Sequence, residues 1–102
     1  MPNCIQLISR ETNEATKFST IDDRLCQWLG VEPDKERYHA AWYDIIGFRL
    51  ALGQSFAQIK EYFTKEMQTS KYSDEYAHLW RIADWLETNY TCNAWAEIGR
   101  AR

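Results

Sequence analysis

Five side chains could bind a transition metal through nitrogen or sulfur: His39, His78, Cys4, Cys26 and Cys92. Zinc ligands usually come in pairs separated by only a few residues, and none of these side chains has another that close along the chain. Asp74 and Glu75 precede His78 by about one helical turn, a spacing that more often serves a solvated helix face. The sequence therefore predicts no metal site, no bound cofactor and three reduced thiols.

Catalytic chemistry has little support in the sequence. A pairing of Cys26 or Cys92 with His39 would be the nearest approach to a nucleophilic centre. The apolar neighbours of Cys26 favour an inert, buried thiol. No two carboxylates have a spacing that imposes a shared site, and the four glycines are dispersed rather than gathered into a phosphate-binding loop. We predict that the protein is not an enzyme.

The segment from residue 46 to residue 63 has the pattern of a helix, a turn at Gly53 and a second helix capped by Ser55 and Gln58. The first two helices of many helix-turn-helix domains have this arrangement. Acidic side chains are mixed with the basic and amide side chains that a recognition helix needs. The same glycine and serine chemistry also joins ordinary helices. We prefer the ordinary helical hairpin and keep a small DNA-binding regulator as an alternative.

Aromatic residues are abundant, with five Trp and six Tyr in 102 residues. Most of them fall on predicted inner faces of helices, where they would build the core. Trp85 lies off the inner stripe of its helix, between Asp84 and Glu87. Exposed aromatic rings beside charges are favoured anchors for protein partners. Any one ring is explained more simply as a shield for the core edge, but we expect at least one to belong to a partner-binding surface.

Length and composition predict one domain that covers residues 1–102. A chain of 102 residues with 45% hydrophobic residues has the usual size of a folded domain and excludes disorder. The net charge of -3 and the scattered basic residues make nucleic acid an unexpected partner. No apolar stretch is long enough for a membrane span, and no secretory signal is visible, so a cytoplasmic location is expected.

The first 19 residues predict a β-hairpin. Residues 4–9 and 15–19 are short and β-prone, and Thr12-Asn13 between them suits a turn. An isolated hairpin is marginal in water, so it must pack on the rest of the domain. Residues 91–102 are expected to form a C-terminal tail that folds back through Trp95 and Ile98.

Residues 20–90 predict a bundle of four helices. The first begins at a Thr20 cap and ends at Gly30, and the third follows the capping box of Ser55 and Gln58. A polar connection over residues 67–72 leads to the fourth, which Ser73 would cap and which runs over residues 74–89. The predicted fold class is mostly α, or α+β: an N-terminal β-hairpin packed on a four-helix body.

The second helix, over residues 35–52, is apolar on most of its circumference and should be surrounded by other elements. Gly47 in its middle would permit a close approach by the hairpin or by another helix. One apolar stripe, with most of the expected core residues, consists of Tyr38, Ala41, Trp42, Ile45, Phe48 and Leu52. A second stripe consists of Tyr43, Ile46 and Leu50.

Short motifs along most of the chain resemble small accessory proteins of tailed phages and prophages. They are residues 7–14, Trp42-Tyr43-Asp44 with Gly47, Gly53 with Ser55, Asp84-Trp85-Leu86-Glu87 with Tyr90, and Asn93-Ala94-Trp95. The resemblance implies a small cytoplasmic protein made in a bacterial host during phage growth. It implies no activity and no site residue.

The predicted function is a non-enzymatic module that binds a host protein and inhibits or redirects it. A nucleic-acid-handling defence complex, such as a CRISPR complex, is the expected target class, because acidic side chains are attracted to basic surfaces. A ligand-binding or sequestering protein with an aromatic pocket is a third hypothesis beside the DNA-binding regulator. A homodimer is compatible with all three. The predicted contact residues are Asp22, Asp23, Asp44, Asp84, Trp85 and Glu87.

Overall fold

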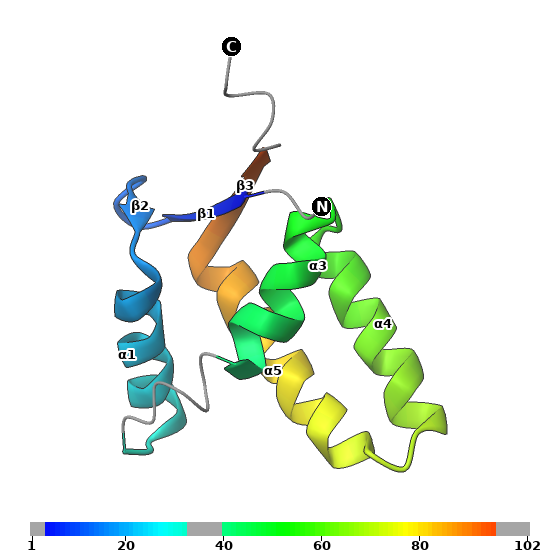
Figure 1. Cartoon of the computed structure of the whole chain (residues 1–102). Coiled ribbons are helices and arrows are strands. Elements are labelled where there is room, and N and C mark those ends of the chain that lie inside the picture. The colour runs from blue at the N-terminus through cyan, green and yellow to red at the C-terminus, as the bar shows by residue number, and fades with distance from the viewer. Residues whose placement is uncertain (1–3, 33–39, 96–102) are drawn as a thin grey trace.

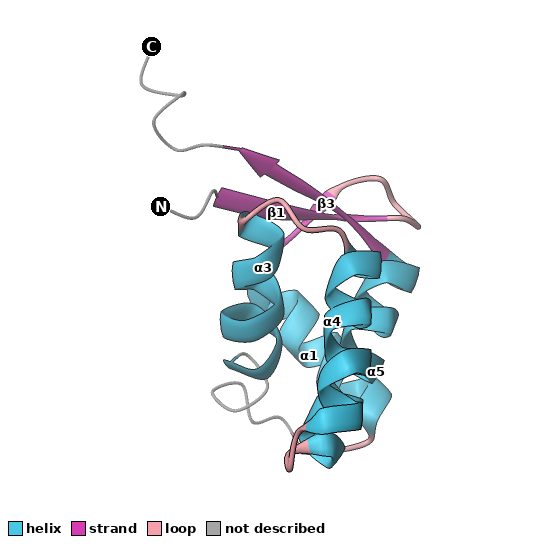
Figure 2. Ribbon diagram, turned by 90° about the vertical axis from the view of Figure 1, so that its right-hand side faces the viewer, coloured by secondary structure: helices cyan, strands magenta, loops and turns pink. Residues whose placement is uncertain are grey.

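The computed structural model describes residues 4–32 and 40–95. Helices form the body of the molecule, and a small antiparallel sheet lies across one end of it (Figure 1, Figure 2). This mostly helical α+β arrangement confirms the predicted fold class. The elements are β1 (Cys4–Ser9), β2 (Ala15–Thr16), α1 (Phe18–Leu29), η1 (Ala40–Gly47), α3 (Phe48–Ala51), α4 (Phe56–Thr69), α5 (Ser73–Asn89) and β3 (Tyr90–Trp95).

The predicted hairpin forms, with Leu7 opposite Thr16 and Ile8 opposite Ala15. Asn13 adopts the left-handed backbone conformation in its turn, at a φ of 60°. The Ser9 hydroxyl accepts hydrogen bonds from the backbone N–H groups of residues 11 and 12, at 3.2 and 3.3 Å. The tight turn is therefore held by its own polar groups.

The chain after α5 is a strand where the sequence led us to expect a tail. β3 pairs antiparallel with β1, from Cys4 opposite Trp95 to Ser9 opposite Tyr90, and the strand order is β2-β1-β3. α5 ends at Asn89, and Tyr90 already has extended backbone, so the helix leads directly into the strand. The pairing makes β1 the central strand. Residues 96–102, including Ile98, lie outside the described residues.

Local capping signals locate helix ends with mixed success. Gly30 ends α1 in the left-handed conformation, and Ser55 with Gln58 forms the predicted capping box of α4. α1 begins at Phe18, before the predicted Thr20 cap. α4 continues to Thr69 through much of the predicted connection, because its residues there still favour helix. α5 begins at Ser73 itself, whose predicted role as a cap was therefore wrong.

The second helical segment differs from an ordinary α-helix. η1 is a π-helix that continues into the short α3; residues 35–39 of the predicted helix, with Tyr38 and His39, lie outside the described residues. In a π-helix, the i→i+5 hydrogen bonds widen each turn.

The buried side chains of this segment are Trp42, Ile46 and Leu50. They follow one another at intervals of four residues and lie on one face of the segment. The prediction that Ile45, Phe48 and Leu52 would be buried was wrong, because the segment turns its other apolar face to the core and leaves these three exposed.

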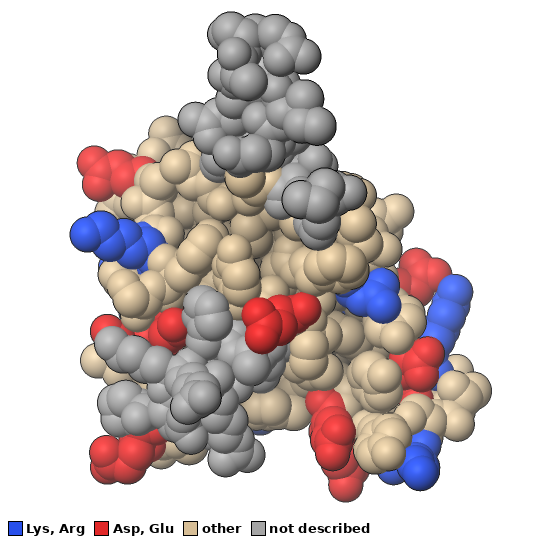
Figure 3. All heavy atoms as spheres, in the orientation of Figure 1, with Lys and Arg blue, Asp and Glu red and all other residues tan. Residues whose placement is uncertain are grey.

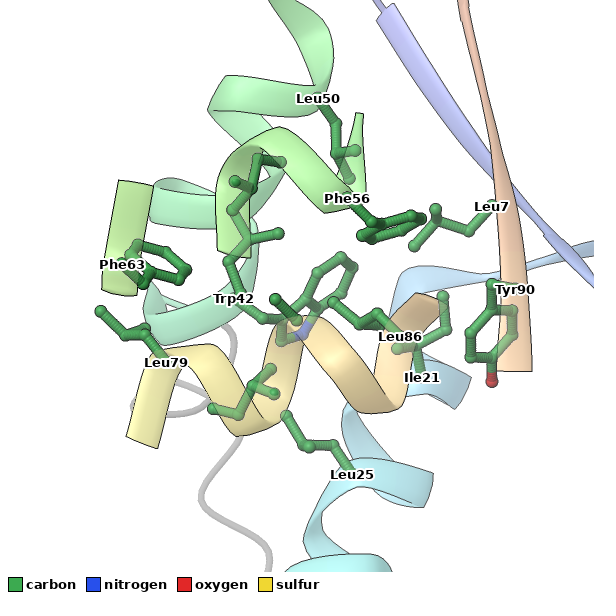
Figure 4. Packing of buried hydrophobic residues seen from close by; sticks show 14 of the residues in the cluster. Leu7, Ile21, Leu25, Trp42, Leu50, Phe56, Phe63, Leu79, Leu86 and Tyr90 are labelled. Atoms are coloured by element: carbon green, nitrogen blue, oxygen red, sulfur yellow. The ribbon is translucent and has the colours of Figure 1, made fainter. Parts of the chain in front are cut away.

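Trp42 lies in the middle of the hydrophobic core (Figure 4). It is fully buried, and residues from α1, α4, α5, β1 and β3 contribute to the same cluster. Gly47 lies beside the sheet: a Cβ atom built on it would be 3.5 Å from Cδ1 of Ile5 and 3.5 Å from Cδ2 of Tyr43. The expected close approach between this helix and the hairpin is therefore present.

Candidate functional site

Three large apolar side chains lie exposed along one segment of the chain. Ile45, Phe48 and Leu52 are 40%, 50% and 52% exposed, and we call them the hydrophobic stripe. Figure 3 shows the side of the molecule that carries η1 and α3, where uncharged side chains predominate. Single exposed apolar residues are ordinary on a protein surface, but a group of them indicates a binding surface.

A hollow of about 270 Å³ adjoins the hydrophobic stripe at Ile45. We call it the tyrosine hollow, and its lining consists of Ile45, Arg49, Tyr62, Tyr72, Glu75, Tyr76 and Leu79. The Arg49 guanidinium lies 3.7 Å from the centre of the Tyr62 ring, and Tyr62 meets Tyr76 edge to face at 6.2 Å. Tyr72 is half exposed. Aromatic rings in such a hollow provide apolar contact area together with hydroxyl groups.

Charges of both signs lie around this surface, and Nζ of Lys71 is 5.2 Å from the centre of the Tyr72 ring. Asp44 is exposed and precedes Ile45, and the exposed Glu75 lines the tyrosine hollow. The positive charge of Arg49 is held against Tyr62, and its Nη1 also donates to Oε1 of Gln54 at 3.4 Å. A partner would therefore meet apolar groups beside the carboxylates of Asp44 and Glu75 and, near Tyr72, the ammonium of Lys71.

The predicted contact residues of α1 have different positions. Asp22 is only 4% exposed, and its carboxylate accepts a hydrogen bond from the indole N–H of Trp42. The structure thus places Asp22 in the core and not on a surface, because a buried donor from η1 reaches it. Asp23 is exposed.

Asp84 and Glu87 lie toward α4. Both accept hydrogen bonds from Nζ of Lys60, at 2.9 and 2.6 Å, and these bonds raise the pKa of Lys60 above its ordinary value. Two of the predicted contact residues therefore have a structural role that links α5 to α4.

Trp85 lies toward α1 and is separated from its two acidic neighbours. Its ring stacks on Trp28 at 5.8 Å and meets Tyr90 at 5.9 Å. Successive residues of a helix are rotated by about 100° around its axis. Asp84, Trp85 and Glu87 are close in sequence but do not form one patch.

A larger hollow, of about 480 Å³, lies beside Trp85. We call it the arginine hollow, and its lining consists of Ser9, Arg10, Glu11, Arg24, Trp85, Thr88, Asn89 and Tyr90. Of these residues, the sequence predicted a binding role for Trp85 alone. The hollow depends on β3 pairing with β1, and no local sequence signal indicated that pairing.

The candidate metal and thiol chemistry gains no geometric support. Among the described residues, no three His, Cys, Asp or Glu side chains form a group that could hold a metal ion. Cys4, Cys26 and Cys92 form no disulfide bond within the described residues, and Cys26 is buried as expected. Burial raises the pKa of the Cys92 thiol, which disfavours the reactive thiolate at neutral pH.

The segment with the helix-turn-helix pattern forms α3, a turn and α4. The two side chains most relevant to DNA recognition have local partners: Gln58 completes the capping box, and Lys60 binds the two carboxylates of α5. Both side chains are therefore engaged within the protein, and α4 packs most extensively against α5.

Comparison of the chain with protein-family models, with curated proteins and with solved structures gave no match. Within residues 4–32 and 40–95, no helix combines the length and the apolar character needed to cross a membrane.

Proposed function

We propose that the protein is a non-catalytic binding module that docks another protein on the hydrophobic stripe and the adjoining tyrosine hollow. The observation that carries the proposal is the exposure of Ile45, Phe48 and Leu52 on one helical segment. The segment is a π-helix for most of its length, and π-helical turns occur frequently at functional sites.

The stripe can contribute substantially to binding. Complete burial of a Leu, Ile or Phe side chain is worth about 1.5–3 kcal/mol. Since these three side chains are already about half buried, covering them in a complex contributes roughly 2–4 kcal/mol. The tyrosine hollow adds a place for a side chain of the partner, as is common at the centre of an interface.

The carboxylates beside the apolar surface favour a partner with basic groups. Asp44 and Glu75 border the apolar surface, so the complementary partner surface is apolar with basic groups around it. Proteins that handle nucleic acids carry such basic surfaces. A host defence complex of this kind, met in the cytoplasm and inhibited by the bound module, is the partner class that we propose, and the acidic groups Asp44 and Glu75 support it.

Affinity capture tests the proposal. Tagged protein and a Phe48→Ser/Leu52→Ser variant are incubated with nuclease-treated bacterial lysate, and bound proteins are identified by mass spectrometry. Val31→Ser is the matched control, because Val31 is also 40% exposed but follows α1. We expect one stoichiometric partner on the wild type and the control, and its loss from the double variant.

Capture of the same partner by the double variant would contradict the proposal. Size-exclusion chromatography with light scattering addresses self-association. A wild-type dimer that becomes a monomer in the double variant would show that a second copy covers the stripe, and it would replace the proposed heterologous partner.

A further inference from the structure

The arginine hollow has the size and chemistry of a small-ligand site. Its volume of about 480 Å³ falls within the range of ligand pockets, roughly 300–1,000 Å³. Its lining comes from the end of β1 and the following turn, from α1, from the last turn of α5 and from the start of β3. It shares no residue with the hydrophobic stripe or the tyrosine hollow.

Two guanidinium groups provide the charge of this hollow. Nε of Arg10 donates to the backbone carbonyl of Glu87 at 2.8 Å, which holds the side chain in place. Nη1 of Arg24 donates to the hydroxyl of Tyr90 at 3.2 Å. Within residues 4–32 and 40–95, no carboxylate forms an ion pair with either arginine. The hollow therefore offers guanidinium donors to an oxyanion in a chain of net charge -3.

Aromatic residues form a rigid wall beside these cations. Trp85 lines the hollow and is fixed between the stacked ring of Trp28 and the edge of Tyr90. Tyr90 is buried, and the Arg81 guanidinium lies 5.2 Å from the centre of the Trp28 ring. A wall that is already ordered costs little conformational entropy when a planar ligand packs against it.

Hydroxyl and amide groups complete the lining. Asn89 and Thr88 contribute polar side chains, although each already donates to a backbone carbonyl of α5, at 2.8 Å in both cases. Their oxygen atoms can still accept hydrogen bonds from a ligand. Glu11 is the one acidic side chain of the lining, and it leaves the charge of the hollow at plus one.

We propose that the arginine hollow binds an organic anion in which a phosphate is joined to a planar aromatic ring, as in a nucleoside monophosphate. The phosphate binds between Arg10 and Arg24, and the ring packs against Trp85. A free mononucleotide and the phosphorylated end of a single strand share this chemistry.

Titration of the purified full-length chain tests the site, with tryptophan fluorescence and isothermal calorimetry as readouts. The probes are AMP, UMP, adenosine and inorganic phosphate. We expect the two nucleotides to bind at least about tenfold more tightly than adenosine or phosphate alone, because only they engage both the guanidinium groups and the wall. Binding should weaken as the salt concentration rises.

Variants locate the site. Arg24→Gln should weaken nucleotide binding by roughly tenfold or more, because it removes a charged hydrogen-bond donor. Thr88→Glu places a carboxylate in the hollow from an exposed helix position and should abolish binding without loss of the fold. Lys65→Gln is the matched control and should leave the affinity unchanged, since Lys65 is an exposed cation of α4 that does not line the hollow.

The results of these binding experiments either support the proposed nucleotide site or overturn it. No nucleotide binding, equal binding of adenosine or phosphate, or unchanged affinity in Thr88→Glu would each overturn the proposal. A 5′-phosphorylated thymidine pentamer distinguishes the two sources of the ligand. Tighter binding of the pentamer than of a mononucleotide assigns the site to a strand end, and equal or weaker binding assigns it to a free nucleotide.

Discussion

At the scale of single residues, the pair of Trp42 and Asp22 dominates the interior. A buried carboxylate is costly unless hydrogen-bond donors compensate for its lost hydration, and the Trp42 indole N–H is such a donor. This pair joins η1 to α1 across the middle of the core. It explains why an aspartate near the start of a helix lies inside the molecule.

Trp42→Phe tests the importance of this hydrogen bond. The substitution keeps an aromatic ring but removes the indole donor from a buried carboxylate and leaves space in the core. We expect the free energy of unfolding, measured with urea, to fall by about 2–4 kcal/mol. Tyr62→Phe, which changes a partly buried ring outside this pair, serves as the comparison and should cost less than about 1 kcal/mol. An equal loss in both variants would contradict the assigned role.

At the scale of elements, backbone conformation distinguishes the glycines at residues 30 and 47. Gly30 has a φ of 73°, and no atom lies within 4 Å of the place that a Cβ atom would occupy there. Gly47 instead has ordinary helical backbone. The left-handed backbone at residue 30 requires a glycine, and the helical backbone at residue 47 does not.

Alanine substitutions at the two glycines should therefore have different effects on the free energy of unfolding. Gly30→Ala should lower the free energy of unfolding by about 1–2 kcal/mol, because a Cβ atom is strained in the left-handed region. Gly47→Ala should leave it unchanged or raise it by up to about 1 kcal/mol, because alanine favours helix and its Cβ would make contacts of 3.5 Å. Urea unfolding of both variants measures the difference, and a larger loss at Gly47 would contradict the described packing against β1.

The packing of α4 on α5 is coupled to pH through Lys60. Its pKa is raised by the hydrogen bonds to Glu87 and Asp84, so the ammonium is stabilised in the folded state. A raised pKa gives a contribution that is fully present below the ordinary value of 10.5 and is lost as the pH rises through the folded-state pKa above it.

Comparison of the wild type with Lys60→Met measures that contribution. The difference in unfolding free energy should be about 1 kcal/mol, in view of the partial exposure of the pair. It should be constant between about pH 7 and pH 9 and decrease above the ordinary pKa of lysine. A difference that instead decreased on going from pH 9 to pH 7 would contradict this sign.

Local chemistry made some elements predictable from sequence. The capping box at Ser55 and the glycine at residue 30 involve only neighbours along the chain, and both were expected correctly. Strand β3 was not predicted from the sequence, because its partner β1 is at the other end of the chain. The stripe that starts at Ile45 was placed in the core because the segment is apolar on two faces, and hydrophobicity alone does not decide which face packs inward.

At the scale of the whole molecule, the candidate surfaces arise from tertiary structure. The arginine hollow combines residues from both ends of the chain, which only the β1–β3 pairing brings together. The predicted acidic patch is divided: Asp22 lies in the core, Asp84 and Glu87 hold Lys60, and Trp85 lies toward α1. Asp44 is the predicted contact residue that lies beside the hydrophobic stripe.

This organisation gives the molecule two separate candidate surfaces for the proposed binding. One is apolar with an acidic border and suits a protein, and the other contains guanidinium groups beside a tryptophan and suits a small aromatic anion. Because the two share no lining residue, a variant at one should leave the other intact. Loss of nucleotide binding and loss of partner capture are therefore separable results.

The central claim is that the hydrophobic stripe is covered by a partner protein in the cell. Site-specific photo-crosslinking tests it most directly, with a photoreactive phenylalanine analogue in place of Phe48 and, as the control, in place of the exposed Thr64 of α4. We expect crosslinking of one distinct host protein from position 48 and none from position 64. The absence of a crosslink from position 48, or equal crosslinking from both positions, would contradict the claim.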